Sequence, residues 1–325
     1  MAHTIKDIKS MEVGWIGLGT LGVEMAKNLQ MHRAANGLSP LLVYNRTASK
    51  CGAVTELGAE AAASPAEVAL HSDVVFISLV NGDAVRAVVQ EMLKAMALDM
   101  SGSSLPLFIA DTTTVHPTMT QALVDEIRKR QSELTRPVVY MQTPVWGAPP
   151  AARARKLVLV TNKNSVPDII SGIAVPAFAR TTIEVADQVQ AAKFKIMGNF
   201  MIAAIIESLG EAMAVSHELG ISRETYHQFV KEILPVPPVV GYSSKMVDDD
   251  GNAAKTQVGF TVPGGMKDVG YAIDVAKSVG MRLPIAELAY EHLQWVNENG
   301  DPKWDWASLA YALRKEAQKK PAQPQ

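Results

Sequence analysis

The sequence predicts an α/β protein with two domains: a doubly wound parallel sheet covered by helices, then an all-α domain joined to it by a long helix. Three observations predict this fold. Short apolar runs alternate with helix-like stretches through the first half of the chain, a pattern typical of a parallel sheet covered on both faces. A glycine-rich turn follows the first run. After about Glu184 only long segments with helical periodicity remain, so we expect domains at residues 1–184 and 185–325.

The apolar runs predict the strands of the first domain. They are Val13 to Ile16, Leu41 to Tyr44, Val74 to Leu79, Leu107 to Ala110, Val138 to Met141 and Leu157 to Val160. Four long periodic segments predict helices in the second half, and they run to Leu219, from Glu224 through the Leu234 region, from Gly265 to Val279 and from Ile285 to Val296. Gly220 is expected to end the first of these helices and Ser222 to cap the second. The prolines at positions 235, 237 and 238 predict a break in the chain before Gly241.

The composition excludes several classes of protein. The 325 residues are 48% hydrophobic and 20% charged, and lysine plus arginine (31) nearly balance aspartate plus glutamate (33). No basic stripe stands out, so we do not expect a nucleic-acid partner. The single cysteine, Cys51, can form neither an internal disulfide nor a paired-cysteine metal site, and the histidines are scattered, so no metal site is expected. The first ten residues lack the apolar core of a secretory signal, which predicts a cytoplasmic protein.

The helix that contains Lys195 is unusually apolar. Between Lys195 and His217 its only formal charges are Glu207 and Glu211, which interrupt the most apolar long segment and argue against a membrane span. A helix that is apolar on most sides is buried on most sides. This predicts a spine between two domains or a helix packed in a homodimer, although an ordinary core helix explains the apolarity equally well.

The turn Gly17-Leu18-Gly19-Thr20-Leu21-Gly22 lies between the first predicted strand and a helix, as in a Rossmann domain. Gly17 permits the tight turn, Gly19 lets the backbone approach a pyrophosphate, and Gly22 lets the helix and strand pack closely. The helix N-terminus presents unpaired N–H groups to the phosphates. The alternative is a plain glycine-rich loop, but the strand-turn-helix context favours a dinucleotide site.

The end of the second strand indicates which dinucleotide binds. A site that selects NAD places Asp or Glu there to accept the ribose 2′-hydroxyl, whereas this chain has Asn45, Arg46 and Thr47. Without a carboxylate to repel a 2′-phosphate, and with Arg46 available to pair with it, we expect NADPH to be preferred over NADH. The alternative for Arg46 is a solvated loop residue.

The motifs resemble those of the β-hydroxyacid dehydrogenase family. This family includes 3-hydroxyisobutyrate dehydrogenase and belongs to the 6-phosphogluconate dehydrogenase superfamily. The family's G-x-G-x-M-G-x-x-M-A-x-N-L appears as Gly17 to Leu29, with Leu21 in place of Met, and its D-x-S-T-x-x-P appears as Asp111 to Pro117, with Thr113 in place of Ser. The resemblance runs from about Val13 to Ser308 and implies that Thr113 and Thr114 lie beside nicotinamide and substrate. Read without the family, Thr114 could simply cap the helix entered at Pro117.

The family's K-x-x-x-N resembles Lys195 to Asn199. Spacing of four residues puts the ammonium and the amide on one helix face, about one turn apart. A lysine in an apolar setting exchanges a proton more readily near neutral pH, so Lys195 is the candidate acid or base, and Asn199 can position the substrate. A lysine that snorkels from a helix end is the structural alternative. Lys193 is a nearby competitor, but Met197 rather than Asn follows it by four residues.

Two further elements resemble the family. Phe260 to Asp268 resembles F-x-L-x-L-x-x-K-D, which implies that Lys267 reaches the cofactor and that Asp268 supports it; an exposed charge pair at a helix start is the alternative. Asp305 and Ser308 loosely resemble a final D-x-S element with a structural role.

The substrate loop departs from the family's D-x-P-V-S-G-G-x-x-G-A-x-x-G-x-L. Pro144, Val145 and Gly147 match, but Gln142 replaces the aspartate and Trp146 replaces the serine, and three glycines are also lost. In the family pattern the glycines and the serine provide backbone and hydroxyl donors for a substrate carboxylate, whereas Trp146 offers an aromatic wall and one indole N–H. A bulky or less polar carbonyl substrate is therefore as consistent with this loop as a small hydroxyacid.

Together these features predict an NAD(P)-dependent oxidoreductase, 3-hydroxyisobutyrate dehydrogenase-like, that acts on a small-molecule carbonyl or β-hydroxyacid. The expected catalytic residues are Lys195 and Asn199, and the expected substrate residues are Thr113, Thr114, Trp146 and Gly147. The expected cofactor residues are Gly17, Leu18, Gly19, Thr20, Leu21, Gly22, Asn45, Arg46, Thr47, Val80, Asn81, Thr114 and Lys267. An imine or bulky-ketone reductase and a non-catalytic NADPH-binding scaffold are the alternatives.

Overall fold

The computed structural model describes residues 8–98, 105–162, 167–248 and 252–317. The chain divides into two compact units, one up to Lys195 and the other from Ile196 onward. The division falls inside a long helix, α8 (Gln188–Glu218), rather than at Glu184 as the sequence suggested. The first turns of α8 belong to the sheet unit, where the Gln188 side chain donates a hydrogen bond to the Tyr140 carbonyl at 3.2 Å.

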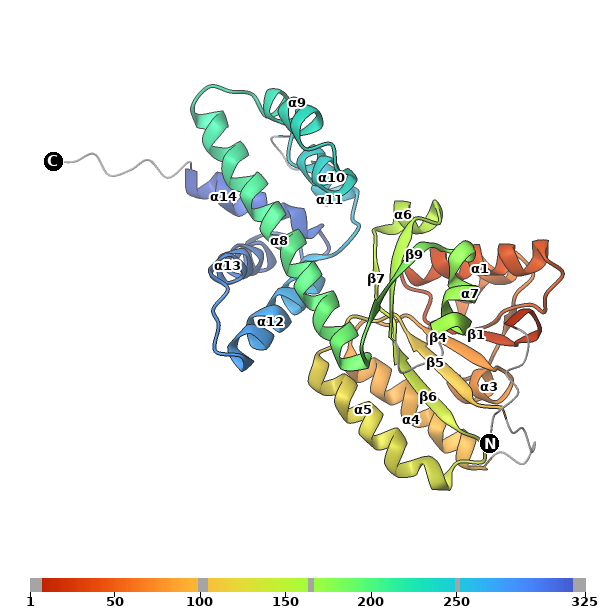
Figure 1. Ribbon diagram of the computed structural model, residues 1–325. Coiled ribbons are helices and arrows are strands. Elements are labelled where there is room, and N and C mark those ends of the chain that lie inside the picture. The colour runs from red at the N-terminus through yellow and green to blue at the C-terminus, as the bar shows by residue number, and fades with distance from the viewer. Residues whose placement is uncertain (1–7, 99–104, 163–166, 249–251, 318–325) are drawn as a thin grey trace. The chain divides into compact units, whose positions relative to one another are not determined.

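The first unit is built on a six-stranded sheet in which every pair of neighbouring strands is parallel (Figure 1). The strands are β1 (Val13–Ile16), β2 (Leu42–Tyr44), β3 (Glu60–Ala61), β4 (Val74–Ile77), β5 (Leu107–Asp111) and β6 (Val138–Gln142), in the order β3-β2-β1-β4-β5-β6. This is the strand order of a dinucleotide-binding doubly wound sheet, in which ligands bind at the carboxyl ends of the strands where the order reverses. The predicted α/β fold class is confirmed.

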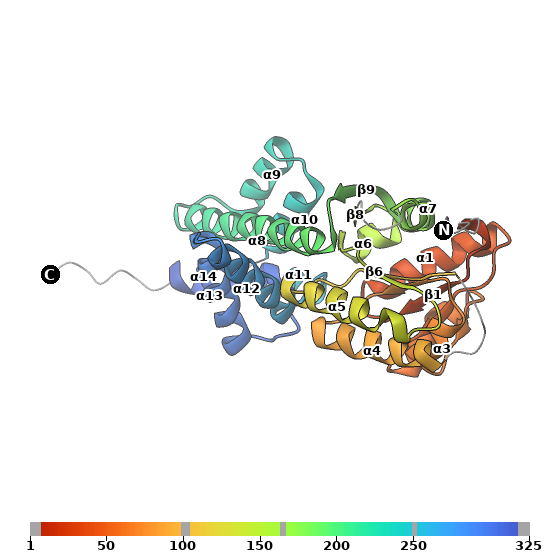
Figure 2. The same cartoon turned by 60° about the horizontal axis from the view of Figure 1, so that its bottom comes forward.

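Helices cover both faces of this sheet, as Figure 2 shows most clearly for α1 on one side and for α3, α4 and α5 on the other. The helices and 3-10 turns of the unit are η1 (Ile8–Ser10), α1 (Gly22–Ala35), η2 (Ala48–Cys51), α2 (Gly52–Thr55), α3 (Pro65–Leu70), α4 (Gly82–Leu98), α5 (Pro117–Arg130), η3 (Gln131–Glu133), α6 (Pro149–Arg153) and α7 (Pro167–Ala177). Each face has its own apolar core: Trp15 and Phe76 stack in one, and Ile77 and Leu107 are buried in the other.

The sixth apolar run, predicted as Leu157 to Val160, belongs to a separate three-stranded sheet. It forms β8 (Leu157–Asn162), which pairs antiparallel with β7 (Val145–Trp146) and parallel with β9 (Ala179–Val185). The sequence identified the run but missed both partners, because a two-residue strand and a strand with mostly exposed side chains have no distinct hydrophobic period.

The second unit is helical, as predicted. After α8 it contains α9 (Arg223–Ile233), α10 (Pro237–Lys245), α11 (Asn252–Thr256), α12 (Val262–Ser278), α13 (Pro284–Asn299), η4 (Trp306–Ser308) and α14 (Leu309–Ala317). Ser222 caps α9 as expected, since its hydroxyl accepts a hydrogen bond from the Thr225 N–H. The break predicted before Gly241 lies between α9 and α10, and Pro237 also begins α10, where proline fits the first turn because its missing N–H has no partner in a helix start.

Helix α8 is only partly covered. It is long and apolar enough to cross a membrane by length and composition, contrary to the expectation that its two glutamates prevent this, and 39% of its most apolar 18-residue window is buried. Glu207 lies in the core of the helical unit, where its Oε1 is 2.7 Å from Nδ1 of His292 on α13. This buried polar contact fastens α8 to the helical bundle.

Candidate active site

The glycine-rich turn connects β1 to α1, and its three glycines differ in their surroundings. Gly17 has a φ of +100°, and a Cβ there would lie 2.2 Å from the Ser78 carbonyl oxygen. A Cβ on Gly22 would lie 2.3 Å from the Gly17 oxygen. Gly19 instead faces open space, with no atom within 4 Å of its ideal Cβ. The first and third glycines are therefore required by the turn itself, and the middle one leaves room for a ligand against the backbone.

The remaining predicted cofactor residues lie in this turn and directly after β2. The Leu18 N–H donates to Asn45 Oδ1 at 2.9 Å, and the Asn45 amide donates to the Thr47 carbonyl at 2.9 Å. Leu21 precedes α1 and provides no side-chain cap, so the first N–H groups of that helix have no capping side chain. Thr20, Arg46 and Thr47 are exposed. Residues 45–47, directly after β2, include no carboxylate. This segment is therefore compatible with a nucleotide that carries either a hydroxyl or a phosphate at the ribose 2′ position.

The loop after β4 carries the other two predicted cofactor residues. Val80 is 76% exposed, which is unusual for a large apolar side chain. Asn81 Oδ1 accepts a hydrogen bond from the Ala84 N–H at 3.0 Å and so holds the start of α4. The loop is also tied to β5, because the Leu79 N–H donates to Thr113 Oγ1 at 2.9 Å. The exposed Val80 therefore stands on a loop whose two ends are fixed.

Thr113 is buried and makes three hydrogen bonds through its backbone and side chain. Besides accepting from Leu79, it donates its N–H to Asp111 Oδ1 at 2.9 Å, and its carbonyl accepts from Gln142 Nε2 at 2.7 Å. Thr114 is less buried and does not cap the next helix: His116 is the N-cap of α5, and its Nδ1 accepts from the Thr118 N–H. Thr113 thus links the ends of three neighbouring strands.

Asp111, Tyr140 and Gln142 form a buried polar network beneath Thr113. The Tyr140 hydroxyl lies 2.7 Å from Asp111 Oδ2 and 2.8 Å from Gln142 Oε1. Burial raises the pKa of the Asp111 carboxyl to about 6, although hydrogen bonds from Thr113 and Tyr140 oppose this. Burial and the nearby carboxylate likewise raise the pKa of Tyr140. The sequence did not predict this network; the signal available was the pair Tyr140 and Gln142 on alternate positions of one strand.

Lys195 lies on the part of α8 that belongs to the sheet unit and is only 7% exposed. Its Nζ is 5.2 Å from the centroid of the Trp146 ring. The Trp146 ring also meets the Phe194 ring edge to face, with centroids 5.0 Å apart and an interplanar angle of 82°. The structure therefore brings Trp146 and Lys195 together, and adds Phe194, which the sequence analysis did not single out.

Asn199 lies one turn further along α8, in the helical unit. Its Nδ2 donates to Asp268 Oδ2 at 2.5 Å, and the other carboxylate oxygen of Asp268 is 2.6 Å from Lys267 Nζ. Asp268 is fully buried, and the Lys267 ammonium is also 4.9 Å from the Tyr271 ring centroid. A carboxylate shared by an amide and an ammonium fixes both donors, so Asp268 holds Asn199 in one orientation.

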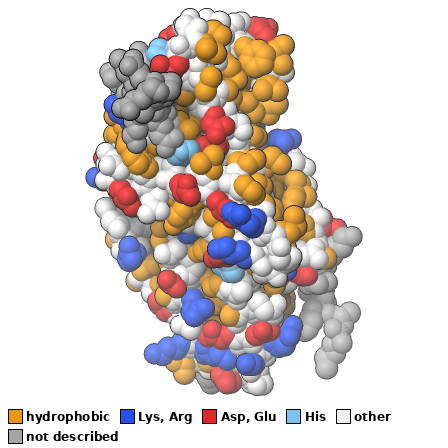
Figure 3. Space-filling model, turned by 90° about the vertical axis from the view of Figure 1, so that its left-hand side faces the viewer, with side chains coloured by type: hydrophobic (Ala, Val, Ile, Leu, Met, Phe, Trp, Pro, Cys, Tyr) orange, Lys and Arg blue, Asp and Glu red, His pale blue; other side chains and the backbone are white. Residues whose placement is uncertain are grey.

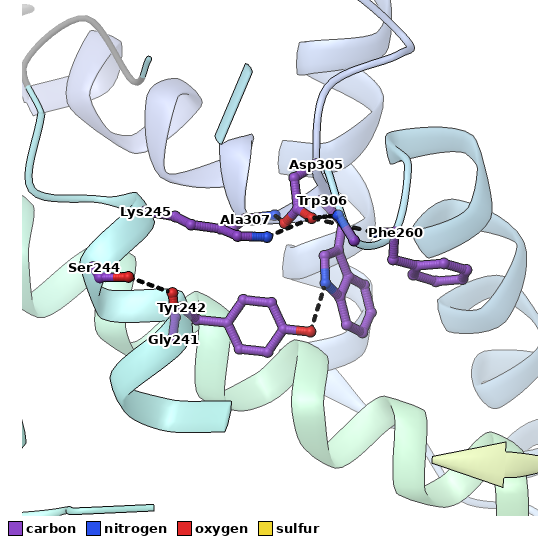
Figure 4. Close-up of polar contacts among 9 residues, drawn as sticks. Gly241, Tyr242, Ser244, Lys245, Phe260, Asp305, Trp306 and Ala307 are labelled. Atoms are coloured by element: carbon purple, nitrogen blue, oxygen red, sulfur yellow. Dashed lines mark hydrogen bonds and ion pairs between the residues drawn. The ribbon is translucent and has the colours of Figure 1, made fainter. Parts of the chain in front are cut away.

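Asp305 anchors the start of α12, the helix that carries Lys267 (Figure 4). Its Oδ2 accepts from the N–H groups of Gly259 and Phe260 and pairs with Lys245 Nζ at 2.7 Å, while Oδ1 accepts from the Ala307 N–H. The adjacent Trp306 indole donates to the Tyr242 hydroxyl at 3.1 Å. These contacts support the structural role expected for Asp305.

Within the described ranges, no group of three or more His, Cys, Asp or Glu side chains could hold a metal ion. The open backbone at Gly19, the uncapped start of α1 and the loop of Val80 together fit a dinucleotide along the carboxyl edge of the sheet. The fold and these residues define a nicotinamide-dependent oxidoreductase with a Rossmann unit and a helical unit.

Comparisons with known proteins support this class. Residues 12–168 match the NAD-binding domain of 6-phosphogluconate dehydrogenase, and residues 190–313 match the NAD-binding domain of NADP-dependent 3-hydroxyisobutyrate dehydrogenase. The chain is 32% identical to the NADH-dependent oxidoreductase ucdB of Aspergillus ustus, over 91% of this chain and 97% of that protein. It is 26% identical to mouse mitochondrial 3-hydroxyisobutyrate dehydrogenase over 94% and 87% of the two chains. The chain belongs to the β-hydroxyacid dehydrogenase family.

Solved structures share the fold. A 3-hydroxyisobutyrate dehydrogenase from Salmonella typhimurium matches 93% of this chain and 99% of its own, with a TM-score of 0.76 and 21% identity. A reductive aminase from Aspergillus terreus matches 94% of this chain and all of its own, with a TM-score of 0.56 and 17% identity. At these identities the likeness concerns the fold alone.

Proposed function

We propose that this chain is an NADPH-dependent oxidoreductase that transfers a hydride between the nicotinamide and a carbonyl or β-hydroxyacid-type substrate. Lys195 carries the proposal. It is buried, it lies against an aromatic ring, and it precedes Asn199 by one helical turn. An ammonium has three N–H donors and can give up a proton, which suits a group that transfers a proton to substrate.

The nicotinamide, when bound, supplies or accepts the hydride at the substrate carbon. In the reducing direction Lys195 Nζ donates a proton to the carbonyl oxygen as the carbon–oxygen π bond breaks, and the resulting amine regains a proton from solvent. In the oxidising direction the neutral amine accepts the hydroxyl proton. Asn199, whose amide N–H donates to Asp268, helps to orient the substrate.

The test is an NADPH-oxidation screen with small semialdehydes, α-keto acids, bulky ketones and cyclic imines, repeated with Lys195→Ala. We expect the variant to lose about a thousandfold in kcat, the range of a general acid, while its Kd for NADPH stays within about twofold. Lys193→Ala is the matched control, because Lys193 is an exposed lysine on the same helix. If the wild type binds NADPH but turns over none of these compounds, the chain is a cofactor-binding scaffold instead.

The choice of NADPH rests on the residues after β2. Arg46 is exposed and no carboxylate stands beside it in the turn that Asn45 holds, so a 2′-phosphate meets attraction rather than repulsion. Arg46→Ala should raise the KM for NADPH by about tenfold, the worth of one charged contact, and leave that for NADH unchanged. Lys50→Ala, which removes another exposed cation nearby in sequence, is the control. A wild type that prefers NADH, as the name of the Aspergillus ustus relative states for that protein, would refute this part.

An imine or bulky-ketone reductase is the second candidate. Trp146 in the substrate loop favours it, and the reductive aminase shares the fold. Turnover of cyclic imines at a higher kcat/KM than any aldehyde or ketone in the screen would establish this candidate in place of the first.

We further propose a cytoplasmic homodimer formed through the helical unit. Large apolar side chains are exposed on α8, on α9 and directly after α8: Met201, Val215, Leu219, Phe229 and Ile233 are 47% to 74% exposed. Hydrophobic side chains also form broad patches in the space-filling view of Figure 3. Exposed apolar side chains of this kind suit contact with a second copy of the same chain.

The dimer is tested by light scattering of Met201→Glu and of Met281→Glu. The two methionines are 58% and 61% exposed, but Met281 lies in the connection between α12 and α13. We expect only Met201→Glu to yield monomers. A monomeric wild type that sediments with phospholipid vesicles would refute the dimer and indicate a membrane surface, and a cell fractionation that places the protein in an organelle would refute the location.

A further inference from the structure

The surface next to the Lys195 ammonium is aromatic. Trp146 and Phe194, here called the aromatic pair, meet edge to face, and the Lys195 Nζ lies 5.2 Å from the Trp146 ring centroid. Trp146 is half-buried and Phe194 is 39% exposed, whereas Lys195 is buried. Part of each ring is therefore accessible beside a buried cation that the proposed function makes the acid or base.

The position of Trp146 is fixed by the backbone on both sides. It pairs with Val158 in the β7–β8 ladder, and the next residue, Gly147, has a φ of +134°. A Cβ on Gly147 would lie 2.4 Å from a Leu157 methyl carbon and 3.1 Å from the Ala151 Cβ. The strand pairing of Trp146 and the close packing of the Gly147 backbone against Leu157 therefore define the backbone from which the Trp146 ring reaches Lys195.

The loop has little to offer a carboxylate. From Val145 to Pro150 the side chains are those of Val, Trp, Gly, Ala, Pro and Pro, and the indole N–H is the one side-chain donor among them. A carboxylate placed against these groups loses its hydration and gains few hydrogen bonds in return. A flat apolar group instead replaces water on two ring surfaces that prefer stacked or edge-to-face contact.

We propose that the aromatic pair binds a flat, uncharged ring substituent on the substrate carbonyl, so that the enzyme takes cyclic or aromatic aldehydes and ketones rather than small carboxylated ones. This inference rests on the proposed function and adds the substrate class. Trp146 also acts as a positioning residue, because the attraction between its ring and the ammonium holds Lys195 Nζ on the side where the carbonyl oxygen must lie.

The experiment compares benzaldehyde with succinic semialdehyde, an uncharged aldehyde with a flat ring and a small carboxylated one, using NADPH and the full chain. The variants are Trp146→Ser, Trp146→Phe and Phe194→Ala, with Trp304→Phe as control. Trp304 belongs to the helical unit and has its own lysine contact, 4.8 Å from Lys255 Nζ to the ring. Thermal unfolding identifies any variant that fails to fold.

We expect the wild type to prefer the ring aldehyde by at least about tenfold in kcat/KM, the discrimination that one apolar pocket provides. Trp146→Ser should reverse that preference, with a higher KM for the ring aldehyde and also a lower kcat for both substrates, because Lys195 loses its positioning ring. Trp146→Phe should keep the kcat for both substrates and the KM for the ring aldehyde within about threefold of the wild type. Phe194→Ala should raise only the KM for the ring aldehyde.

The outcomes separate this inference from the proposed function. Reduction of succinic semialdehyde at a higher kcat/KM than the ring aldehyde, with the ratio unchanged in Trp146→Ser, would overturn the inference and leave the oxidoreductase intact. The inference would also be overturned if the control Trp304→Phe lowered activity as much as Trp146→Ser does. Failure of the wild type to reduce either aldehyde, any other carbonyl or any imine while it binds NADPH would overturn the proposed function itself.

Discussion

The buried carboxyl of Asp111 makes the stability of the sheet unit depend on pH in a direction opposite to that of most carboxylates. The side chain is fully buried, and its pKa is raised from 3.8 to about 6. A carboxyl whose pKa is higher in the folded state binds its proton more tightly there than in the unfolded chain. The stabilisation of the folded state by protonated Asp111 is therefore full below about pH 4 and is lost as the pH rises through about 6.

The magnitude follows from the two pKa values. One pKa unit corresponds to ~1.4 kcal/mol, so the rise from 3.8 to about 6 means that ionising Asp111 costs the folded state on the order of 3 kcal/mol. Asp111→Asn removes this titration and keeps the shape. Its amide oxygen can accept from the Thr113 N–H, and its amide nitrogen can donate to the Tyr140 oxygen, whose own proton then goes to Gln142.

The assay is urea unfolding of the wild type and Asp111→Asn between pH 4 and pH 8. We expect the advantage of the variant to grow by about 3 kcal/mol between pH 4 and pH 7. Asp274→Asn, at an exposed carboxyl, should show no such dependence. Direct titration of the Asp111 carboxyl carbon by NMR should give a midpoint near 6, and Tyr140→Phe should move it higher because a hydrogen bond to the carboxylate is lost. A midpoint near 4, or a difference between the proteins that stays flat with pH, would refute the reasoning.

Two further predictions follow from the glycine turn and the helical core. Gly19→Ala should leave thermal stability unchanged but weaken NADPH binding by about tenfold, whereas Gly17→Ala should lower stability by about 2 kcal/mol or more, since its φ of +100° and the nearby Ser78 oxygen both oppose a Cβ; equal stabilities of the two variants would contradict this difference. His292→Leu should cost about 3 kcal/mol in urea unfolding because it leaves the buried Glu207 carboxylate without this partner, and the double variant Glu207→Leu with His292→Leu should recover much of the loss. A double variant less stable than His292→Leu would argue against a desolvation cost at Glu207.

The parts of the fold that local patterns determine were predictable. Val13 to Ile16 is a buried strand with the expected bounds, and the turn after it has glycines where backbone conformation and close packing demand them. The family assignment was confirmed because its motifs are local as well. Sheet membership was not predictable in the same way: the run at Leu157 has the composition of a buried strand, but which strands it pairs with depends on contacts far along the chain.

In the candidate site, too, local features were predictable and tertiary contacts were not. Lys195 and Asn199 were predicted from their resemblance to the family's K-x-x-x-N signature, a local motif on one helix. The contact of Lys195 with Trp146, and the network that joins Asp111 on β5 to Tyr140 on β6, depend on tertiary packing and strand register, which the sequence pattern leaves open. The prolines correctly predicted the break after α9, but the sequence pattern did not show that Pro237 also begins a helix, because proline occurs both after helix ends and at helix starts.

The boundary between the two units lies within one turn of α8, between Lys195 and Asn199. A helix advances ~1.5 Å per residue, so these two side chains are spaced about 6 Å apart along the axis by the backbone hydrogen bonds of that turn. Their spacing is thus a property of local chain geometry and is independent of domain packing. It persists through any rearrangement of one unit against the other that leaves the helix intact, so the proposed proton donor and the amide proposed to orient the substrate keep their spacing even while other parts of the molecule move.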